Sequence, residues 1–423
     1  MANAEVETEV ITTADGVPLK QALKKALWER KKTALLLVAP LFLFVMITFL
    51  IPIFDMLIRS VDNSIAGEQF PTVIEELGDW DLNSSEIPGE ETFQALVKDF
   101  KAGAKAKTIS RLGRRLNYEM SGMSGLFRKT ARKIKKLEPP ENATEAMIAI
   151  DKKWGKIETW RVIKRESGRY TSSYYLSSLD AEKKSDGSFG MKSEDRRVYM
   201  NLFWRTIRLS FTITFLTILL GYPIAYLLST VKTKTSNMLI ILVLLPFWTS
   251  LLVRTSSWIA LLQKEGVIND ILVGVGLLSD DNRLAMIHNE TGTIVAMTHI
   301  LLPFMVLPLF SVMKTIPPSW VRAARSMGAT PFTAFVRVYL PNTVAGIGAG
   351  GILVFILAIG YYITPALVGG TTGTLISNFI AYHVSTSLNW GLAAALGTIL
   401  LLLVLALYIL YDKVVGINNM KLG

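Results

Sequence analysis

Three polar or aromatic side chains share one face of a long apolar segment. Ser250, Arg254 and Trp258 are spaced four residues apart within residues 238–262, which places them along one side of a helix. An arginine in a membrane-spanning segment is costly unless it faces protein, a partner or a water-filled path. This face therefore predicts part of the wall of a path for a polar solute. The alternative is an arginine that reaches from the segment to the membrane surface.

Two aromatic residues are further candidates for the same path. Trp248 lies just before Ser250, and Tyr361 lies near the end of residues 344–367, ahead of a proline and two glycines. Aromatic faces attract organic cations, whereas Arg254 would repel them. The ring of Tyr361 also fits an aromatic belt at the membrane surface. The full candidate path consists of Trp248, Ser250, Arg254, Trp258 and Tyr361.

A short basic connector between two apolar segments has the pattern of a contact site for a partner protein. Pro317 and Pro318 indicate the start of a helix, and Gly328 is placed to end it with a positive φ angle. Arg322 and Arg325 lie three residues apart on one face of this helix. The other interpretation is an ordinary amphipathic connector that only orients the chain in the membrane.

Residue types needed for catalysis or metal binding do not form a recognisable pattern. The chain has no cysteine and no G-x-x-x-x-G-K-[ST] loop, and His288, His299 and His383 are scattered without acidic neighbours at metal-ligand spacing. His299, inside an apolar segment, is predicted to be a hydrogen-bonded structural residue. We therefore predict no enzyme activity, no bound cofactor and no metal in this chain.

Apolar segments dominate the 423 residues, of which 51% are hydrophobic. Six of them are long enough to cross a hydrocarbon core as helices. The fold class predicted is an all-α membrane protein with six transmembrane helices. The segments are residues 33–57, 202–228, 238–262, 293–313, 344–367 and 391–411.

The formal charge of +11 is distributed unevenly among the connectors. Lysine and arginine precede the first segment, follow the second, fourth and last segments, and are absent from residues 368–390. This alternation is the positive-inside pattern, so both termini are predicted to be cytoplasmic. The charge is thus no sign of nucleic-acid binding.

The predicted organisation has five parts. They are a cytoplasmic N-terminal segment (1–32), a first span (33–59), an extracytoplasmic insertion (60–198), spans two to six with a cytoplasmic coupling loop at 314–343 (199–411), and a cytoplasmic tail (412–423). The N-terminal part, with Leu23, Leu27 and Trp28, forms either a helix on the inner membrane surface or only an orienting charge cluster.

The insertion is predicted to be mostly helical, with residues 187–195 as the linker back to the membrane. Apolar residues recur at helical spacing near Phe93 and Phe100, and again near Met147 and Trp154. A shorter helix is expected over residues 267–278. In the fifth span, Gly346 and Gly350 are four residues apart and predict a close approach of two helices.

The basic connector resembles the cytoplasmic signature loop of permease subunits of bacterial ATP-binding-cassette (ABC) importers. That pattern is Glu-Ala-Ala, three residues, Gly, nine residues, Ile, one residue, Leu-Pro. Val338 replaces the isoleucine, and Arg322 stands where the family has glutamate. The matching residues are Ala323, Ala324, Gly328, Leu340 and Pro341. Residues 245–250 and 389–392 are similar to spermidine/putrescine-type permeases.

The resemblance implies a permease of a binding-protein-dependent importer in the bacterial inner membrane. Its partners would be two cytoplasmic ATP-binding subunits that hold ATP and Mg²⁺, a second permease chain and an extracytoplasmic substrate-binding protein. A helix at residues 320–327 would couple the ATPase to the membrane helices. The implied coupling residues are Trp320, Arg322, Ala323, Ala324, Arg325, Gly328, Leu340 and Pro341. Polyamines, other amines, amino acids and opine-like compounds are all open as substrates.

Two other functions remain as alternatives. An ion-coupled secondary transporter typically places carboxylates at mid-bilayer, but here Asp55 lies near the outer end of the first span. A membrane scaffold that displays the insertion would not explain the signature loop.

Overall fold

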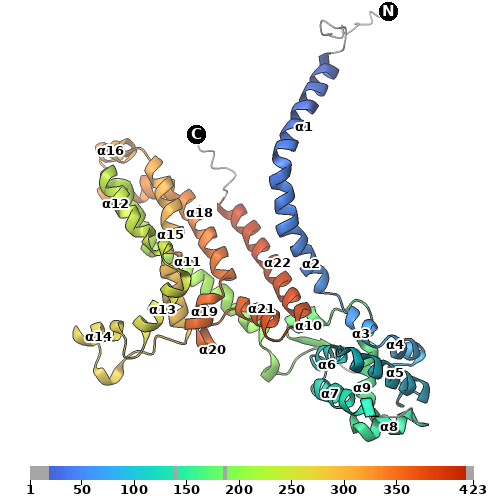
Figure 1. The fold of residues 1–423 in the computed structure, drawn as a ribbon. Helices are drawn as coiled ribbons and strands as arrows, with labels where there is room; N and C mark the ends of the chain where they lie inside the picture. Colours follow the sequence, from blue (N-terminus) through green and yellow to red (C-terminus); the bar gives the residue numbers. More distant parts are fainter. Residues whose placement is uncertain (1–18, 137–140, 184–187, 416–423) are drawn as a thin grey trace, which may run out of the picture. The chain divides into compact units, whose positions relative to one another are not determined.

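The structure is a computed structural model, which describes residues 19–136, 141–183 and 188–415 (Figure 1). Nearly all of this chain is helical, with one small two-stranded sheet. Contacts divide the chain into two units, with the boundary between Ile58 and Arg59. Five helices are long and apolar enough to cross a membrane, or six if a bent pair counts as one span.

The first unit is one long helical stretch. It consists of α1 (Leu19–Val45), a π-helical turn (Met46–Leu50) and α2 (Ile51–Arg59). From Leu19 the chain is helical without a break into the first span, so the described part of residues 1–32 forms no separate surface helix. Residues 1–18 lie outside the described chain.

The insertion folds as a small helical domain, which we call the outer domain (residues 60–198). Its helices are α3 (Ser64–Gln69), α4 (Pro71–Glu76), α5 (Glu90–Ala106), α6 (Ile109–Asn117), α7 (Met123–Lys133), α8 (Ala143–Ile150), α9 (Ile157–Arg165) and α10 (Ser173–Ser178). Strands β1 (Ala181–Lys183) and β2 (Phe189–Met191) pair antiparallel. The linker predicted at 187–195 is therefore wrong in part, because it contains β2 and a 3-10 turn (Glu194–Arg196); residue 187 lies outside the described chain.

Aromatic rings fill the core of the outer domain. Phe93 and Phe100 of α5 are fully buried, as their spacing predicted, and the Phe93 ring centroid lies 4.8 Å from that of Trp160. The indole of Trp160 donates to the carbonyl of Trp154 over 2.8 Å, and the indole of Trp154 donates to Thr130 over 3.0 Å. Large buried rings with hydrogen-bonded N–H groups thus build the core of a domain that has no cysteine.

Two adjacent segments, which we call the stem (residues 61–63 and 169–171), flank the part of the outer domain that contains α3 to α9. Asp62 pairs antiparallel with Tyr170. The amide of Asn63 donates to the carbonyl of Arg169, and the amide of Thr171 donates to that of Val61, both over 2.8 Å. Both ends of residues 64–168 therefore meet at one place, and α10 and the small sheet follow the stem.

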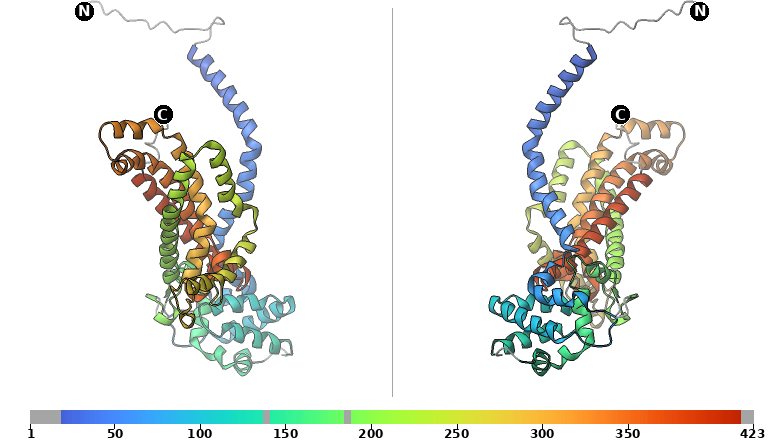
Figure 2. Two further views of the ribbon diagram at one scale, coloured as in Figure 1. Left: turned by 90° about the vertical axis from the view of Figure 1, so that its left-hand side faces the viewer. Right: turned by 90° about the vertical axis from the view of Figure 1, so that its right-hand side faces the viewer.

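The membrane part is built around three long helices, α11 (Tyr199–Thr230), α15 (Glu290–Thr315) and α18 (Leu340–Gly360), which pack on one another (Figures 1 and 2). A Cβ added to Gly350 would lie 2.8 Å from Met305 Sδ, and one added to Gly346 would lie 3.1 Å from Leu309 Cα. This confirms the predicted close approach of two helices. The last helix, α22 (Trp390–Val415), includes residues 412–415 of the predicted tail; residues 416–423 lie outside the described chain.

The third apolar segment is not one helix, so that prediction is wrong. It consists of α12 (Thr233–Leu244), a 3-10 turn (Leu245–Trp248) and α13 (Leu251–Leu262), and the chain bends by 94° at the break. Pro246 lacks an N–H group, and the Ser250 hydroxyl accepts from the amide of Val253, which starts a new helix. The following α14 (Val267–Gly274) ends before the predicted residue 278.

Short elements complete the chain between the long helices. They are α16 (Pro318–Ser326), α17 (Pro331–Ala334), a π-helical turn (Phe335–Tyr339), α19 (Ile363–Val368), α20 (Gly370–Gly373) and α21 (Ile376–Ser385). Further 3-10 turns lie at Leu77–Asp79, Ile134–Lys136, Lys152–Gly155 and Asp280–Asn282. Both ends of the predicted coupling loop are thus helical.

Candidate functional site

Helix α16 begins and ends as the sequence predicted. Pro318 occupies its first turn, and Gly328 follows it with φ of +92°. The amide of Ala329 donates to the carbonyl of Ala324 over 3.1 Å, so this carbonyl in the last turn of the helix has a hydrogen-bond partner. A residue with a side chain is strained in this conformation.

The apolar residues of α16 face two directions, which differs from the single stripe expected. Ala324 is only 7% exposed, and Val321 packs against the apolar core of the membrane helices. Trp320 is half exposed, while the arginines Arg322 and Arg325 lie on the surface. Ala324 therefore supports the position of α16 from inside and does not form its outer surface.

Two exposed apolar residues beside α16 were missed in the sequence. Met327 is 82% exposed and Phe332 is 76% exposed. With Trp320 they are the exposed large apolar side chains of residues 318–334, and we call these three the loop patch (Trp320, Met327 and Phe332). Large apolar side chains in an otherwise basic connector were the signal in the sequence. An exposed apolar patch is typical of a protein–protein contact.

Aromatic contacts connect the loop to the membrane helices. The ring centroid of Tyr226, on α11, lies 5.9 Å from that of Phe335 and 5.3 Å from that of Tyr339, both in the π-helical turn. The hydroxyls of Tyr339 and Ser229 are 3.3 Å apart. Leu340 and Pro341, the last two residues of the motif, begin α18 directly after this turn. A displacement of the loop would thus act on both α11 and α18.

The candidate path residues fall into two groups, separated by the bend. Trp258 on α13 donates from its indole to Nδ1 of His299 over 3.1 Å, so His299 is hydrogen-bonded as expected. Arg254 lies one helical turn before Trp258 on the same helix. Trp248, before the bend, is 73% exposed and lies outside this group, whose members are Arg254, Trp258 and His299. Tyr361, at the end of α18, packs against the apolar core of the membrane helices.

Ser250 and Arg254 differ from the roles expected of a continuous helical face. Ser250 is the N-cap of α13, and its hydroxyl oxygen already accepts a hydrogen bond from the amide of Val253. Arg254 is half-buried, and its Nε has no hydrogen-bond partner within the described chain. Thr255 Oγ1 lies 3.2 Å from Thr364 Oγ1, which ties α13 to α19. An arginine with an unused donor, one helical turn from Trp258, can contact a polar solute.

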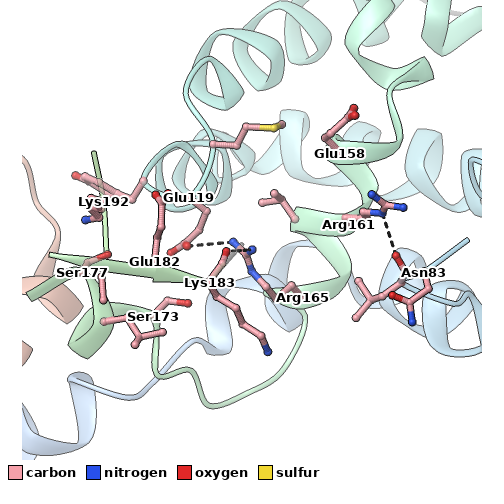
Figure 3. A pocket seen from close by; sticks show the side chains of 16 residues that line it. Asn83, Glu119, Glu158, Arg161, Arg165, Ser173, Ser177, Glu182, Lys183 and Lys192 are labelled. Carbon is pink, nitrogen blue, oxygen red and sulfur yellow. Dashed lines mark hydrogen bonds and ion pairs between the residues drawn. The ribbon is translucent and has the colours of Figure 1, made fainter. Parts of the chain in front are cut away.

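A cavity of about 660 Å³ in the outer domain is lined by charges of both signs (Figure 3). Arg165 in its wall donates to Glu119 over 3.2 Å, and Arg161 donates to the carbonyl of Leu82 over 2.9 Å. Burial lowers the pKa of Lys192 in the same wall. The lining holds four basic and three acidic side chains, so neither sign of charge dominates enough to select a ligand.

No metal centre is evident in the part of the chain that the structure describes, where no three histidine, aspartate or glutamate residues form a group suited to a metal ion.

Comparison with known proteins identifies the class of the chain. The family model described as "Binding-protein-dependent transport system inner membrane component" matches residues 210–415. The chain is also 35% identical over 222 residues to the spermidine/putrescine transport system permease protein PotB of Haemophilus influenzae, a match that covers 52% of this chain and 77% of that protein. The chain belongs to this family of inner membrane components. The permease is therefore a subunit of an ABC importer, as the signature loop predicted.

Other relatives agree with this assignment. The permease is 29% identical over 224 residues to PotB of Escherichia coli (53% of this chain, 81% of that protein). It is 32% identical over 226 residues to the inner membrane ABC transporter permease protein YdcU of Escherichia coli (51% and 72%).

Solved structures of importers are more distant. The bacterial ABC transporter that imports the acidic polysaccharide alginate gives a TM-score of 0.44 at 21% identity, covering 54% of this chain and 82% of that one. The MetNI methionine ABC transporter gives a TM-score of 0.41 at 19% identity, covering 53% and 98%. We draw no conclusion about substrate from either.

Proposed function

We propose that the permease forms the membrane path for a polyamine or a related small amine, amino acid or opine-like solute. The observation that carries this proposal is the 35% identity to a spermidine/putrescine permease over 77% of that relative's length. In the proposed topology both termini are cytoplasmic and the outer domain is extracytoplasmic, in line with the positive charges beside the first, second, fourth and last apolar segments.

ATP hydrolysis is proposed to take place on separate subunits, which hold ATP and Mg²⁺. The proposed assembly has two such subunits, a second permease chain and an extracytoplasmic substrate-binding protein. The loop patch and the exposed Arg322 and Arg325 support α16 as the contact with an ATPase subunit, because apolar side chains with surrounding charges are suited to docking. Because Arg322 replaces the family's glutamate, the facing ATPase surface should be acidic.

Coupling in this proposal runs from α16 through its connections to the long helices. Closure of the ATPase subunits would move α16, and the contacts of Phe335 and Tyr339 with Tyr226 would pass that motion to α11. Helices that move as packed units can alternate between outward-open and inward-open states. The coupling residues proposed are Trp320, Arg322, Ala323, Ala324, Arg325, Gly328, Leu340 and Pro341.

The group around Trp258 is proposed to line the solute path. The rings of Trp258 and Tyr361 offer faces for a cationic amine, while Arg254 would repel such a cation or bind a carboxylate. A solute that carries both an amine and a carboxylate would satisfy both features. A polyamine would need the positive charge of Arg254 to be offset by another subunit. Trp248, at the end of the 3-10 turn, and Ser250, at the start of α13, remain in the proposed path.

Uptake into proteoliposomes tests this function. The permease, its second permease chain and the ATPase subunits would be reconstituted, and labelled spermidine or a labelled basic amino acid would be presented with the binding protein. We expect ATP-dependent uptake that falls in Trp258→Ala. Uptake driven by an ion gradient without ATP would instead indicate a secondary transporter, and no uptake of any amine or amino acid would favour a scaffold.

A further inference from the structure

A second cavity, of about 460 Å³, lies where the outer domain meets the start of α22. We call it the junction cavity. Helix α6 contributes Arg111 and Arg114 to one wall, and the start of α22 contributes Trp390, with Asn389 just before it, to the other. Arg59, at the end of α2, also lines it. The cavity thus connects an outer-domain helix with the end of a membrane-spanning helix.

The walls of the junction cavity carry an excess of positive charge. Arg111 and Arg114 form no ion pair with any residue that the structure describes. Arg115, behind them, is already paired with Glu166 over 2.7 Å. Asp62 is the acidic residue of the lining, and one of its oxygens accepts from the hydroxyl of Ser64 over 3.0 Å. This differs from the cavity of Figure 3, which is lined by four basic and three acidic side chains.

A buried donor without an acceptor lies in the same wall. Asn389 is 6% exposed, and its Oδ1 accepts from the amide of Leu392 over 3.3 Å at the start of α22. Its Nδ2 has no hydrogen-bond partner within the described chain. A buried N–H donor without an acceptor lowers the stability of the folded protein. The start of the 26-residue helix α22 also favours a nearby negative charge, because of the helix dipole. Both features are accounted for by a bound anion.

The position of the cavity favours a membrane lipid as the source of that anion. Arg59 ends the apolar stretch Ala26–Arg59, and Trp390 begins the stretch Trp390–Lys413. The guanidinium of Arg59 lies 6.0 Å from the centroid of the Trp390 ring. Tryptophan and arginine at the ends of spans are typical of the headgroup level of a membrane.

We propose that the junction cavity binds the phosphate group of an anionic phospholipid. Arg111 and Arg114 supply charge-assisted hydrogen bonds from the outer domain, and Nδ2 of Asn389 supplies a donor from the start of α22. The lipid then joins the outer domain to the last membrane helix. Assignment to the outer leaflet rests on the proposed topology, whereas the binding itself does not depend on transport.

Spin-labelled phosphatidylglycerol tests the site in the full-length permease reconstituted in phosphatidylcholine vesicles. Electron paramagnetic resonance measures the fraction of label that is motionally restricted by the protein. In the double variant Arg111→Gln, Arg114→Gln we expect the selectivity for labelled phosphatidylglycerol over labelled phosphatidylcholine to fall about fivefold, through the loss of charge-assisted hydrogen bonds. The matched control is Arg128→Gln, Arg132→Gln, which removes two exposed arginines of α7.

A second variant tests the donor without removing the helix cap. Asn389→Asp keeps an oxygen that can accept from the amide of Leu392 but replaces Nδ2 by a negative oxygen. We expect a similar loss of lipid selectivity and an unchanged thermal unfolding midpoint. Retention of full selectivity in both the double variant and Asn389→Asp would overturn the site.

Inorganic phosphate separates a lipid from a soluble ligand. Millimolar phosphate, added to vesicles that contain labelled phosphatidylglycerol, should leave the restricted fraction unchanged at constant ionic strength. Displacement of the label by phosphate, lost in Asn389→Asp, would assign the cavity to a soluble phosphate and overturn the lipid. Neither result depends on which solute the importer carries, so a failure of the proposed function would be seen separately, in the uptake assay.

Discussion

At the residue scale, Gly328 determines how the coupling loop leaves α16. Its φ is +92°, and an added Cβ would meet no atom within 4 Å, so the cost of a side chain there is backbone strain alone. For Gly328→Val we expect about 1–2 kcal/mol of local strain and the loss of most ATP-dependent uptake, with normal membrane insertion. Gly328→Asn is the matched control, because asparagine tolerates this conformation. Normal uptake by the valine variant would remove the loop from the mechanism.

Glu90 gives the outer domain a defined dependence on pH. A hydrogen bond from the Thr144 hydroxyl holds the pKa of Glu90 below its usual value. Burial acts in the opposite direction and raises the pKa, whereas hydrogen bonds from the amides of Ala143 and Thr144 lower it further. A lowered pKa contributes stability above the unfolded-state value of about 4.3, and this stability is lost as the pH falls through the folded pKa.

We therefore expect Glu90→Gln to loosen the start of α8 at neutral pH but not in acid. Amide exchange in residues 141–150, corrected for the intrinsic rate, should be about fivefold faster in the variant at pH 7, through the loss of charge-assisted hydrogen bonds. The difference should vanish once the pH falls below the lowered pKa of Glu90. Glu91→Gln, a change at the exposed neighbouring residue, is the control. A difference that persists in acid would exclude this carboxylate as the cause.

At the scale of elements, the packing of α15 on α18 depends on two glycines. A Cβ at Gly346 would lie 3.1 Å from the backbone of Leu309, which cannot move aside as a flexible side chain can. Gly346→Val should therefore lower stability in detergent by about 1–3 kcal/mol. Gly397→Val, on α22, is the control, because no atom lies within 4 Å of the added Cβ there. Equal unfolding midpoints for the two variants would contradict this packing argument.

The two faces of α16 should respond differently to substitution. Phe332→Ser removes an exposed ring from the loop patch, so we expect weaker co-purification with the ATPase subunit and unchanged thermal stability of the permease alone. Ala324→Asp places a charge at a buried position and should lower the stability of the permease itself, by about 1–3 kcal/mol. If Phe332→Ser binds the ATPase normally, the loop patch is not the docking surface.

At the scale of the whole molecule, the stem allows a clean removal of residues 64–168, which hold α3 to α9 of the outer domain. Asn63 and Arg169 are joined by a 2.8 Å hydrogen bond, so a linker of a few glycines in place of residues 64–168 leaves α10 and its contacts with α22 in place. We expect this deletion to retain the folded membrane helices and to lower the ATPase stimulation by the binding protein severalfold. Full stimulation after the deletion would mean that the outer domain is not the docking site.

Charge reversal tests a weaker contribution of the same domain. Arg128 and Lys133 belong to the basic stretch of residues 128–136. Replacing both by glutamate should slow association with an acidic binding protein at low salt and have less effect at high salt. An association rate that is independent of salt would exclude electrostatic steering.

Local patterns determined much of the fold from the sequence. Apolar length indicated the membrane-spanning segments, because every backbone amide in a bilayer must be bonded within its own helix. Helical spacing indicated the buried Phe93 and Phe100, and the motif spacing indicated the positive φ of Gly328 and the importer family. Each of these features depends on residues that are close in the chain.

Only the tertiary structure decided which faces are covered and which residues meet. The bend between α12 and α13 separates Trp248 from Trp258, and packing buries Ala324 while it leaves Met327 and Phe332 exposed. The stem and the junction cavity bring together residues that are far apart in the sequence. Such contacts depend on the three-dimensional packing of whole helices. The periodicity of a single segment does not predict this packing, because the periodicity specifies which face of a helix is buried but not which residues lie against that face.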